Sequence, residues 1–588
     1  MSTAIDPVAR WAVAAILLCG LAGAIRAEPL ASQAQGQRAL LSADFLLGDD
    51  ELPSPVDTAA YTPLNEAPAI HRFEGRLELL AGPGAGRTRG LVDRFGYLED
   101  PALELASLPG FSFDFVQSGD ALVPVKRGPQ RSAHPHWEFI LEPGRVWNEA
   151  GDGGWSRVSL PFALQERNAN CTHNGLLSFL FQSDGRVSRV VYQVASETCQ
   201  YLQADLWGIL DAVYRPGRIA RAESIVASFR QEIAARMPVK PLSELARSYA
   251  GVQARDFDWF PPDEVSAVGF AIDGIHYRGG CGTRYGDYPF CEVLDLPSYS
   301  LAKSIFAGTA YMVLKQENPD AGELKVTDFV PECRNGDRWN AVTLANLVDM
   351  GTGNYESLEH DVDEYASYET PFMAGDTHLA KISAACTLFP RKAAPGTTFA
   401  YHTSDTYIAG TLMNAWLRQQ PRSVSRDIHA DVLVAKVFDP LRLSPVVRTT
   451  KRTYDSVAQP FAGYGLTLQT DDIVRLGLFL ARGDGAIGGR QVLHRGELSA
   501  ALQLDSADPG LVAGDATLRY NNGFWAYLTD LGGACEEAVW IPFMSGYGGI
   551  SVALMPNQSV FYVFSDHGRF EWLKAAMASN RIRPIASC

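Results

Sequence analysis

The stretch PSYSLAKSIFAGTAYMVL, residues 297–314, decides how this sequence is interpreted, because it places Ser300 three residues ahead of Lys303 at the start of a predicted helix. Residues three apart share one face of a helix, so the Lys303 amine could reach the Ser300 hydroxyl. A serine hydroxyl is a weak nucleophile that needs a base, and a lysine becomes one when burial lowers its pKa. Taken alone the spacing is unspecific, since a helix-capping serine followed by a surface lysine has the same pattern.

Four later segments carry further motifs. They are RWNAVTLANLVDMGTGN (338–354), PGTTFAYHTSDTYIAGTLM (395–413), YGLTLQTDDIVRLGLFLARGDG (464–485) and MSGYGGISVALMP (544–556). Together with SLAKSIFAG (300–308), they resemble in type and order the motifs of the serine β-lactamase and penicillin-binding-protein superfamily, especially its branch of class C β-lactamases, esterases and 6-aminohexanoate-dimer hydrolases. The resemblance implies a β-lactamase-like α+β (α/β) domain in which helices flank an antiparallel sheet.

The resemblance also implies a role for each matching residue. Ser300 would be the nucleophile, and Lys303 would be its proton acceptor or its electrostatic activator. Tyr401 would shuttle a proton between nucleophile, lysine and leaving group, which requires a lowered phenol pKa. The backbone N–H groups of Ser300 and Tyr547 would form the oxyanion hole. The implied reaction is hydrolysis of an ester or short amide through an acyl-enzyme.

Two positions depart from the usual motifs and narrow the substrate. Met544, Ser545 and Gly546 stand where the superfamily usually has a lysine-led motif, and Thr403 stands where β-lactamases typically have an asparagine. We expect Thr403, Ser545 and Gly546 to contact the substrate. Because a β-lactam or a muropeptide carries a carboxylate that such a cation grips, the loss of the lysine favours a small-molecule ester or short-amide substrate.

Two other functions stay open. A catalytically weak or inactive binding protein of the cell envelope would keep this fold, and the altered third motif favours it, whereas the retention of Ser300, Lys303 and Tyr401 together speaks against it. A true β-lactamase or D,D-peptidase would need another cation in place of Met544. No GxSxG or HExxH motif is present, so the sequence predicts neither an α/β-hydrolase elbow nor a metal, and no cofactor.

The first residues, 1–27, are predicted to be a secretory signal peptide. Arg10 precedes an apolar stretch at residues 11–24, and small residues follow that suit cleavage. An uncleaved membrane anchor is the alternative. No later segment is apolar enough to span a bilayer, so we expect a periplasmic or secreted chain without a membrane span after signal removal.

The cysteines are consistent with export. The chain has 9 cysteines, and removal of Cys19 with the signal leaves an even number in a compartment where disulfides persist. Proximity suggests the pairs Cys171 with Cys199 and Cys281 with Cys291; Cys333 with Cys386 and Cys535 with Cys588 would follow by elimination. Buried free thiols are the alternative.

Residues 28–237 are predicted to form a mainly β accessory domain that ends in a helix. RFEGRLELL (72–80) and FSFDFV (111–116) alternate apolar and polar residues, and LLSFLFQSDGRVSRVVYQV (176–194) is typical of a hairpin that turns at Asp184 and Gly185. IARAESIVASFRQEIAARM (219–237) has the apolar period of a helix. The domain could be a sandwich that binds a glycan or an envelope partner, or a structural cap. His134 and His136 could bind a metal, although a surface or satisfied histidine pair explains them better.

Residues 238–588 are predicted to form the catalytic domain. VSAVGFAIDGIHYRGG (265–280) and GISVALMPNQSVFYVFSDHG (549–568) each indicate two strands, so that both ends of this part contribute to one sheet packed by helices. EHDVDEY (359–365) is interpreted as a solvated acidic loop rather than a calcium loop. Its Asp361, Asp363 and Glu364, with His378, could disfavour anionic substrates. The net charge of -16, without a clustered basic face, excludes nucleic acid as a partner.

Overall fold

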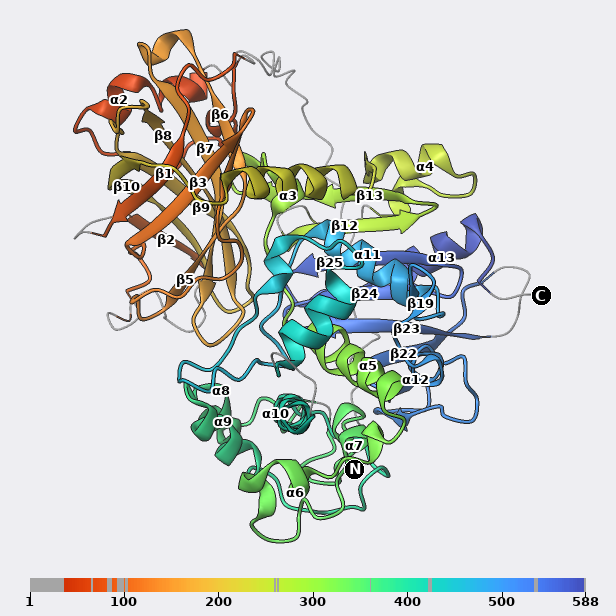
Figure 1. Ribbon diagram of the computed structural model, residues 1–588. Coiled ribbons are helices and arrows are strands. Elements are labelled where there is room, and N and C mark those ends of the chain that lie inside the picture. The colour runs from red at the N-terminus through yellow and green to blue at the C-terminus, as the bar shows by residue number, and fades with distance from the viewer. Residues whose placement is uncertain are drawn as a thin grey trace, which may run out of the picture.

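A computed structural model describes residues 36–64, 67–81, 87–92, 100, 104–257, 261, 264–359, 361–420, 426–532 and 538–585. The predicted signal peptide, residues 1–27, lies outside these ranges, as do Cys535 and Cys588. No helix within them has the length and apolar character that a bilayer crossing requires. The structure is a mixed α+β protein, as predicted, with two large sheets that lie side by side (Figure 1).

The first sheet closes into a barrel. It contains β1 (Glu74–Leu80), β2 (Arg87–Val92), β3 (Phe111–Ser118), β4 (Ala121–Pro124), β5 (Trp137–Leu141), β6 (Gly144–Trp147), β7 (Ser156–Glu166), β8 (Thr172–Phe181), β9 (Val190–Thr198) and β10 (Gln203–Pro216). The order β1-β3-β4-β6-β7-β8-β9-β10 returns to its start because β10 also pairs with β1, at Leu77↔Tyr214 for example. β5 pairs with β7 beside β6, and β2 pairs with the amino-terminal end of β10.

The barrel interior explains the alternating sequence pattern. Leu77, Leu79, Phe113 and Phe115 are buried in it, as their period of two predicts, and the hairpin from β8 to β9 turns where Asp184 and Gly185 lie. Apolar and aromatic side chains fill the space between the strands, which is the usual content of a barrel of this size. The closed barrel replaces the sandwich that the sequence suggested.

The second sheet has nine strands in the order β11-β13-β12-β25-β24-β23-β22-β21-β20. They are β11 (Val239–Pro241), β12 (Val265–Ile272), β13 (Ile275–Gly280), β20 (Leu511–Val512), β21 (Leu518–Asn521), β22 (Phe524–Thr529), β23 (Val539–Gly546), β24 (Ile550–Met555) and β25 (Ser559–Ser565). All pairs are antiparallel except β11 with β13. The pairing of β12 with β25 confirms that both ends of this part build one sheet.

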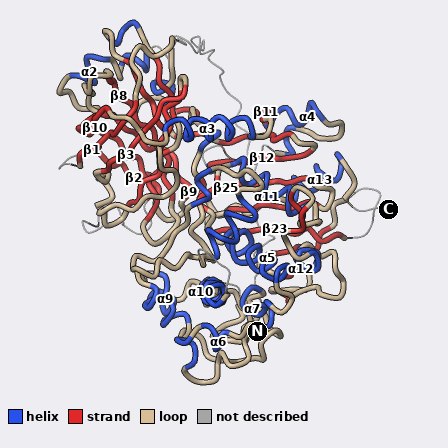
Figure 2. Tube along the Cα trace, viewed as in Figure 1, coloured by secondary structure: helices blue, strands red, loops and turns tan. Residues whose placement is uncertain are grey.

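Helices cover both faces of the second sheet and gather below it (Figure 2). Beside α2 (Ala43–Leu47) of the amino-terminal part, they are α3 (Ala222–Ala235), α4 (Leu245–Ser248), α5 (Thr309–Glu317), α6 (Val326–Phe329), α7 (Leu344–Val348), α8 (Thr370–Met373), α9 (His378–Ala385), α10 (Thr403–Gln419), α11 (Thr470–Ala481), α12 (Arg495–Ala501) and α13 (Leu573–Ile582). α11 packs on one face of β24 and β25, and α13 packs on the other. The predicted helix after Ser300 and the predicted helix at 219–237 are both present.

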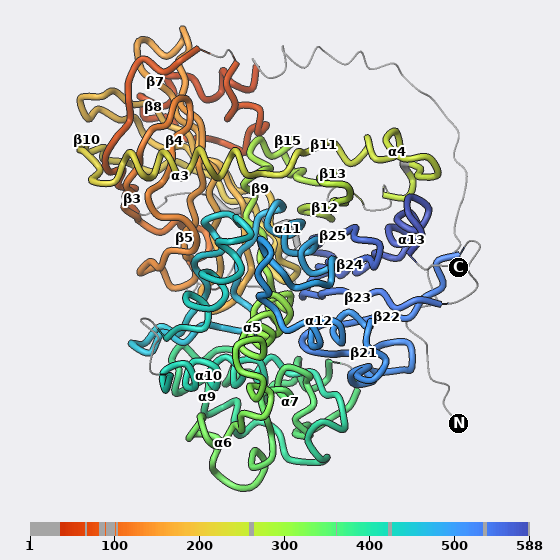
Figure 3. The backbone as a smooth tube through the Cα atoms, turned by 45° about the vertical axis from the view of Figure 1, so that its right-hand side comes forward, coloured from red at the N-terminus to blue at the C-terminus, as the bar shows by residue number. Residues whose placement is uncertain are grey.

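The barrel and the second sheet share buried contacts. α3 leads from the barrel to β11 (Figure 3), and it stays half-exposed along its length. A single apolar core joins barrel residues such as Ile140 and Trp207 to residues of the helical region. Lys451 donates hydrogen bonds to the Glu138 carboxylate (2.5 Å) and to the Glu166 carbonyl (2.7 Å) across the junction.

Disulfides join Cys171 to Cys199, Cys281 to Cys291 and Cys333 to Cys386, as the sequence predicts. Disulfides of this kind persist in oxidising compartments, which is compatible with export.

Candidate active site

Ser300 lies in the turn that enters the helix ending with α5. The preceding segment, β16 (Leu296–Pro297), is held by pairing with β17 (Thr467–Leu468). The helix passes through a wider π-helical stretch at Lys303–Gly308, and this places the Lys303 amine 2.9 Å from the Ser300 hydroxyl oxygen. The contact that the three-residue spacing predicts is therefore present.

The Lys303 amine is buried behind Ser300. It donates hydrogen bonds to the Thr403 hydroxyl (2.7 Å) and to the Gly463 carbonyl (3.3 Å), and it lies 4.8 Å from the centre of the Tyr401 ring. Burial lowers the Lys303 pKa to about 8, although the Glu364 carboxylate acts in the opposite direction. A lysine with this pKa is partly neutral near neutral pH, and only the neutral amine accepts a proton.

Tyr401 lies two residues before α10, next to this pair. A hydrogen bond links its side chain to Ser300, but burial, followed by the Glu364 charge, raises the phenol pKa well above its ordinary value. The lowered pKa that a Tyr401 shuttle requires is therefore not found. A neutral phenol still donates a hydrogen bond, so the geometry suits Tyr401 as a proton donor rather than as the resting base.

Thr403 connects Lys303 to a carboxylate. Its hydroxyl accepts from Lys303 and donates a short hydrogen bond to Glu364, whose second oxygen accepts from the Thr403 backbone N–H (2.8 Å). The hydrogen-bonded series thus runs from Ser300 through Lys303 and Thr403 to Glu364. The motifs do not predict this role for Glu364. The acidic composition of residues 359–365 draws attention to the loop, but it does not single out Glu364.

The loop that carries Glu364 is anchored by a buried ion pair. Asp363 is 3% exposed and accepts hydrogen bonds from the Tyr368 hydroxyl (2.7 Å) and from the His402 ring (3.1 Å). Burial alone would lower the His402 pKa, but hydrogen bonds with Asp363 and Asp405 raise it to about 9. The interpretation of 359–365 as a solvated loop is therefore wrong for Asp363, because this carboxylate pairs with an imidazolium.

β23 forms the opposite wall. Its alternation turns Phe543 and Ser545 toward the space beside Ser300, which Tyr547, just past the end of the strand, also lines. Met544 is 1% exposed and belongs to the apolar core. Gly546 is required by close approach, because a Cβ there would lie 2.9 Å from the Ser298 carbonyl oxygen. This contact brings the end of β23, and with it the backbone of Tyr547, against the turn that holds Ser300.

These residues surround a cavity of about 700 Å³. It is lined by all the predicted site residues except the buried Lys303, namely Ser300, Tyr401, Thr403, Ser545, Gly546 and Tyr547. The wall also contains the carboxylates of Asp361 and Glu364 and many aromatic rings, among them Tyr365, Tyr464, Trp525 and Phe570. Within the described part of the chain, no arginine, lysine or histidine lines it.

The predicted histidines lie elsewhere. His378 does not line the cavity, and its ring contacts the Tyr407 hydroxyl (2.8 Å). His134 accepts from the backbone N–H groups of His136 (3.1 Å) and Trp137 (2.9 Å), so it is a satisfied structural histidine. Among the described residues, no group of three or more histidine, cysteine and acidic side chains is placed to hold a metal ion.

Comparison with known proteins gives partial likenesses. No protein-family model and no curated protein sequence matches the chain. Among solved structures, a putative 6-aminohexanoate-dimer hydrolase from Bacillus anthracis is 19% identical, with 59% of this chain and 86% of that chain covered and a TM-score of 0.42. A putative β-lactamase from Bacteroides dorei is 17% identical (57% and 97% covered, TM-score 0.38), and a penicillin-binding-protein homologue from Caulobacter crescentus is 18% identical (59% and 96% covered, TM-score 0.37).

These descriptions name the kinds of protein that the sequence motifs resemble. The identities and TM-scores are low, and the fold and the site are therefore defined by the geometry of this chain alone.

Proposed function

We propose that the protein is a serine hydrolase that forms an acyl-enzyme on Ser300 and releases it with water. The observation that carries the proposal is the buried Lys303 amine, 2.9 Å from the Ser300 hydroxyl at the wall of a cavity. A nucleophile within hydrogen-bond reach of a base whose pKa lies near neutrality is the arrangement that covalent catalysis requires.

The proposed reaction has two halves. Neutral Lys303 accepts the Ser300 proton while the serine oxygen bonds to the substrate carbonyl carbon, and the backbone N–H groups of Ser300 and Tyr547 stabilise the oxyanion. As the carbonyl re-forms, the bond to the leaving group breaks, and Tyr401 donates a proton to that alcohol or amine while it receives one from Lys303. Water then repeats the sequence on the acyl-enzyme and frees the acid.

The cavity wall supports an ester or short-amide substrate without a carboxylate. Asp361 and Glu364 face this space, and no basic side chain among its described lining residues would bind an anion. A volume of about 700 Å³ suits a small molecule rather than a polymer. We further propose export to the periplasm or beyond, on the basis of the disulfides and the predicted signal. The filled barrel interior offers no support for a glycan partner.

The test is the intact mass of the purified protein after brief exposure to a short-chain nitrophenyl ester, a fluorophosphonate and a penicillin. We expect adducts from the ester and the fluorophosphonate, none from the penicillin, and none in Ser300→Ala. Lys303→Ala should lose nearly all turnover.

Other outcomes identify the alternatives. A penicillin adduct would favour a β-lactamase or D,D-peptidase. The absence of every adduct on a folded protein would favour a binding protein and would overturn the proposal.

A further inference from the structure

The barrel contributes to the wall of the catalytic cavity. Two of its connections reach that wall: the β7–β8 connection, which carries Asn168, Ala169 and Asn170, and the β9–β10 connection, which carries Tyr201. The barrel is therefore part of the site's construction, although none of the sequence motifs lies in it.

Asn170 holds the nucleophile turn. Its side-chain oxygen accepts hydrogen bonds from the backbone N–H of Tyr299 (3.0 Å) and of Gly465 (2.8 Å), and the Asn170 residue is 1% exposed. The Ser298 hydroxyl donates to the same oxygen (3.4 Å). Because the donors include two backbone N–H groups, the orientation of the amide is fixed: only its oxygen can accept. Tyr299 directly precedes Ser300 and has a φ of +40°, in the left-handed region that non-glycine residues rarely adopt.

The second donor, the backbone N–H of Gly465, lies in the segment that also binds Lys303. Gly465 lies two residues after Gly463, whose carbonyl accepts a hydrogen bond from Lys303 (3.3 Å). The side-chain oxygen of Asn170, a barrel residue, thus binds both the turn that carries Ser300 and the segment whose Gly463 carbonyl accepts the hydrogen bond from Lys303. A displacement of about 1 Å between such groups is enough to cost roughly two orders of magnitude in rate.

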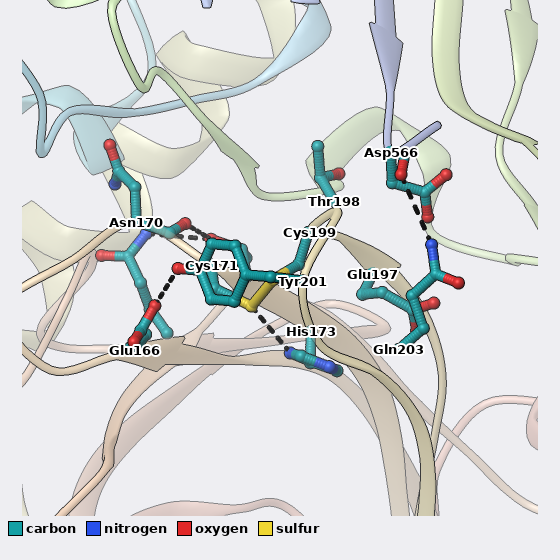
Figure 4. Close-up of a disulfide and its surroundings, with 12 residues drawn as sticks. Glu166, Asn170, Cys171, His173, Glu197, Thr198, Cys199, Tyr201, Gln203 and Asp566 are labelled. Carbon is teal, nitrogen blue, oxygen red and sulfur yellow. Dashed lines mark hydrogen bonds between the residues drawn. A yellow bond between two sulfur atoms is a disulfide. The ribbon is translucent and has the colours of Figure 1, made fainter. Parts of the chain in front are cut away.

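A disulfide holds Asn170 itself. Cys171 directly follows Asn170 and is bonded to Cys199, two residues before Tyr201, and both cysteines are buried (Figure 4). The Tyr201 hydroxyl donates to Glu166 at the end of β7, which closes the two connections into one unit. The Tyr201 ring lies 6.1 Å from the ring of Tyr547, whose backbone is proposed to bind the oxyanion.

We infer that Asn170 is a positioning residue that fixes the Ser300 turn relative to Lys303, and that the Cys171–Cys199 disulfide keeps Asn170 in place. This inference rests on the proposed serine-hydrolase function. It gives the barrel a definite role in catalysis, because the barrel completes the active site and the motifs of residues 300–556 are incomplete without it.

The test compares Asn170→Leu, which keeps a side chain branched at the same atom but loses the acceptor, with Asn170→Asp, which retains an acceptor. We expect Asn170→Leu to lower kcat of a nitrophenyl ester by about a hundredfold with little change in KM, and Asn170→Asp to restore activity to within about tenfold of the unmodified protein. A general loss of folding would affect both variants alike. Unchanged kcat in Asn170→Leu would overturn the inference.

The matched control is Asn174→Leu. Asn174 is also a buried barrel asparagine, and it bridges to the second part of the chain through the backbone of Asp295 (2.9 and 3.2 Å), but it does not line the cavity. We expect Asn174→Leu to keep kcat within about threefold. An equal loss in Asn174→Leu and Asn170→Leu would show that the junction acts only through stability, and the inference would fail.

The disulfide provides a second, independent test. The double variant Cys171→Ala/Cys199→Ala should lose at least about tenfold in the single-turnover acylation rate, whereas Cys333→Ala/Cys386→Ala, which removes a disulfide outside the cavity wall, should not. Equal rates in the two double variants would contradict the role of the disulfide. If the unmodified protein forms no Ser300 adduct, the proposed function itself fails; if it does and Asn170→Leu is acylated equally fast, only this inference fails.

Discussion

The charge at Glu364 should set the pH at which Lys303 works. The Glu364 carboxylate raises the Lys303 pKa, while burial, the larger effect, brings it down to about 8. In Glu364→Gln only burial and the weaker charges of Asp361 and Glu369 remain, so the pKa should fall further. We expect the acidic limb of kcat/KM to move to lower pH and kcat to drop about tenfold or more, the cost of a charge-assisted hydrogen bond.

Glu359→Gln is the matched control for this prediction. Glu359 lies on the same loop, but it is exposed and does not line the cavity. Its substitution should change neither the pH of the acidic limb of kcat/KM nor the value of kcat. An acidic limb that stays fixed in Glu364→Gln would mean that this carboxylate does not act on Lys303.

Local sequence predicts the residues that lie around Ser300, but it does not predict the hydrogen bonds that link them to distant parts of the chain. Ser300, Lys303 and Tyr401 can be predicted because their spacing and flanking motifs are local. The bonds from Thr403 to Glu364 and from Asn170 to Tyr299 join positions 39 and 129 residues apart, and no periodicity records such contacts. The predicted direction of the Tyr401 pKa is wrong because burial, which only the folded chain defines, outweighs the hydrogen bond to Ser300.

At the scale of an element, the loop that carries Asp363 and Glu364 is stabilised by the charge of the buried His402 ring. The His402 pKa of about 9 lies above its ordinary 6.5, so the stabilisation by Asp363 and Asp405 is complete below pH 6.5 and is lost as the pH rises through about 9. His402→Phe keeps the stacking on Phe389 but removes the charge. We expect the variant to lose about 3 kcal/mol of unfolding free energy at pH 6, and clearly less at pH 9.5, in urea titrations.

His378→Phe serves as the comparison for the loop. Its ring contacts the Tyr407 hydroxyl rather than a carboxylate, so its deficit should not shrink between pH 6 and 9.5. A deficit in His402→Phe that is equal at both pH values would rule out a charged His402.

The helix after Ser300 illustrates what periodicity predicts about an element. The apolar pattern predicts its presence, but it carries no signal for the π-helical stretch at Lys303–Gly308 or for its contact with a distant turn. A Cβ on Gly308 would lie 2.2 Å from the carbonyl oxygen of Asn522, so the helix packs directly on the backbone of the β21–β22 turn. Similarly, the core-facing side of Met544 is set by the register of β23 with β24, which motif alignment does not contain.

For the whole molecule, the sequence divides the chain near residue 238, and this boundary remains a proposal. The barrel strands are visible as alternating runs, but closure requires β1 to pair with β10, more than 130 residues later at Leu77↔Tyr214. A pairing at that separation leaves no local signal. The sequence likewise does not predict the apolar core and the polar contacts that the two parts share. These shared contacts indicate that the two parts fold together.

This shared core leads to a prediction about cooperativity. Glu138 and Lys451 form an ion pair across the junction with 5% and 1% of their side chains exposed, and the Tyr454 hydroxyl donates to the same carboxylate (2.6 Å). We expect calorimetry to record one unfolding transition for the whole chain. Glu138→Leu should lower the unfolding free energy by about 3 kcal/mol or more, because it leaves a buried ammonium without its partner.

Asp120→Asn is the matched substitution on the barrel surface. It removes the ion pair with Arg145, whose side chains are 40% (Arg145) and 68% (Asp120) exposed, and its cost should stay below about 1 kcal/mol. If the barrel were an independent accessory domain, the unmodified protein would unfold in two steps. Glu138→Leu would then lower the midpoint of each step by no more than Asp120→Asn lowers it. A single transition that Glu138→Leu shifts as a whole would instead mean that the part containing Ser300 requires the barrel to reach its native state.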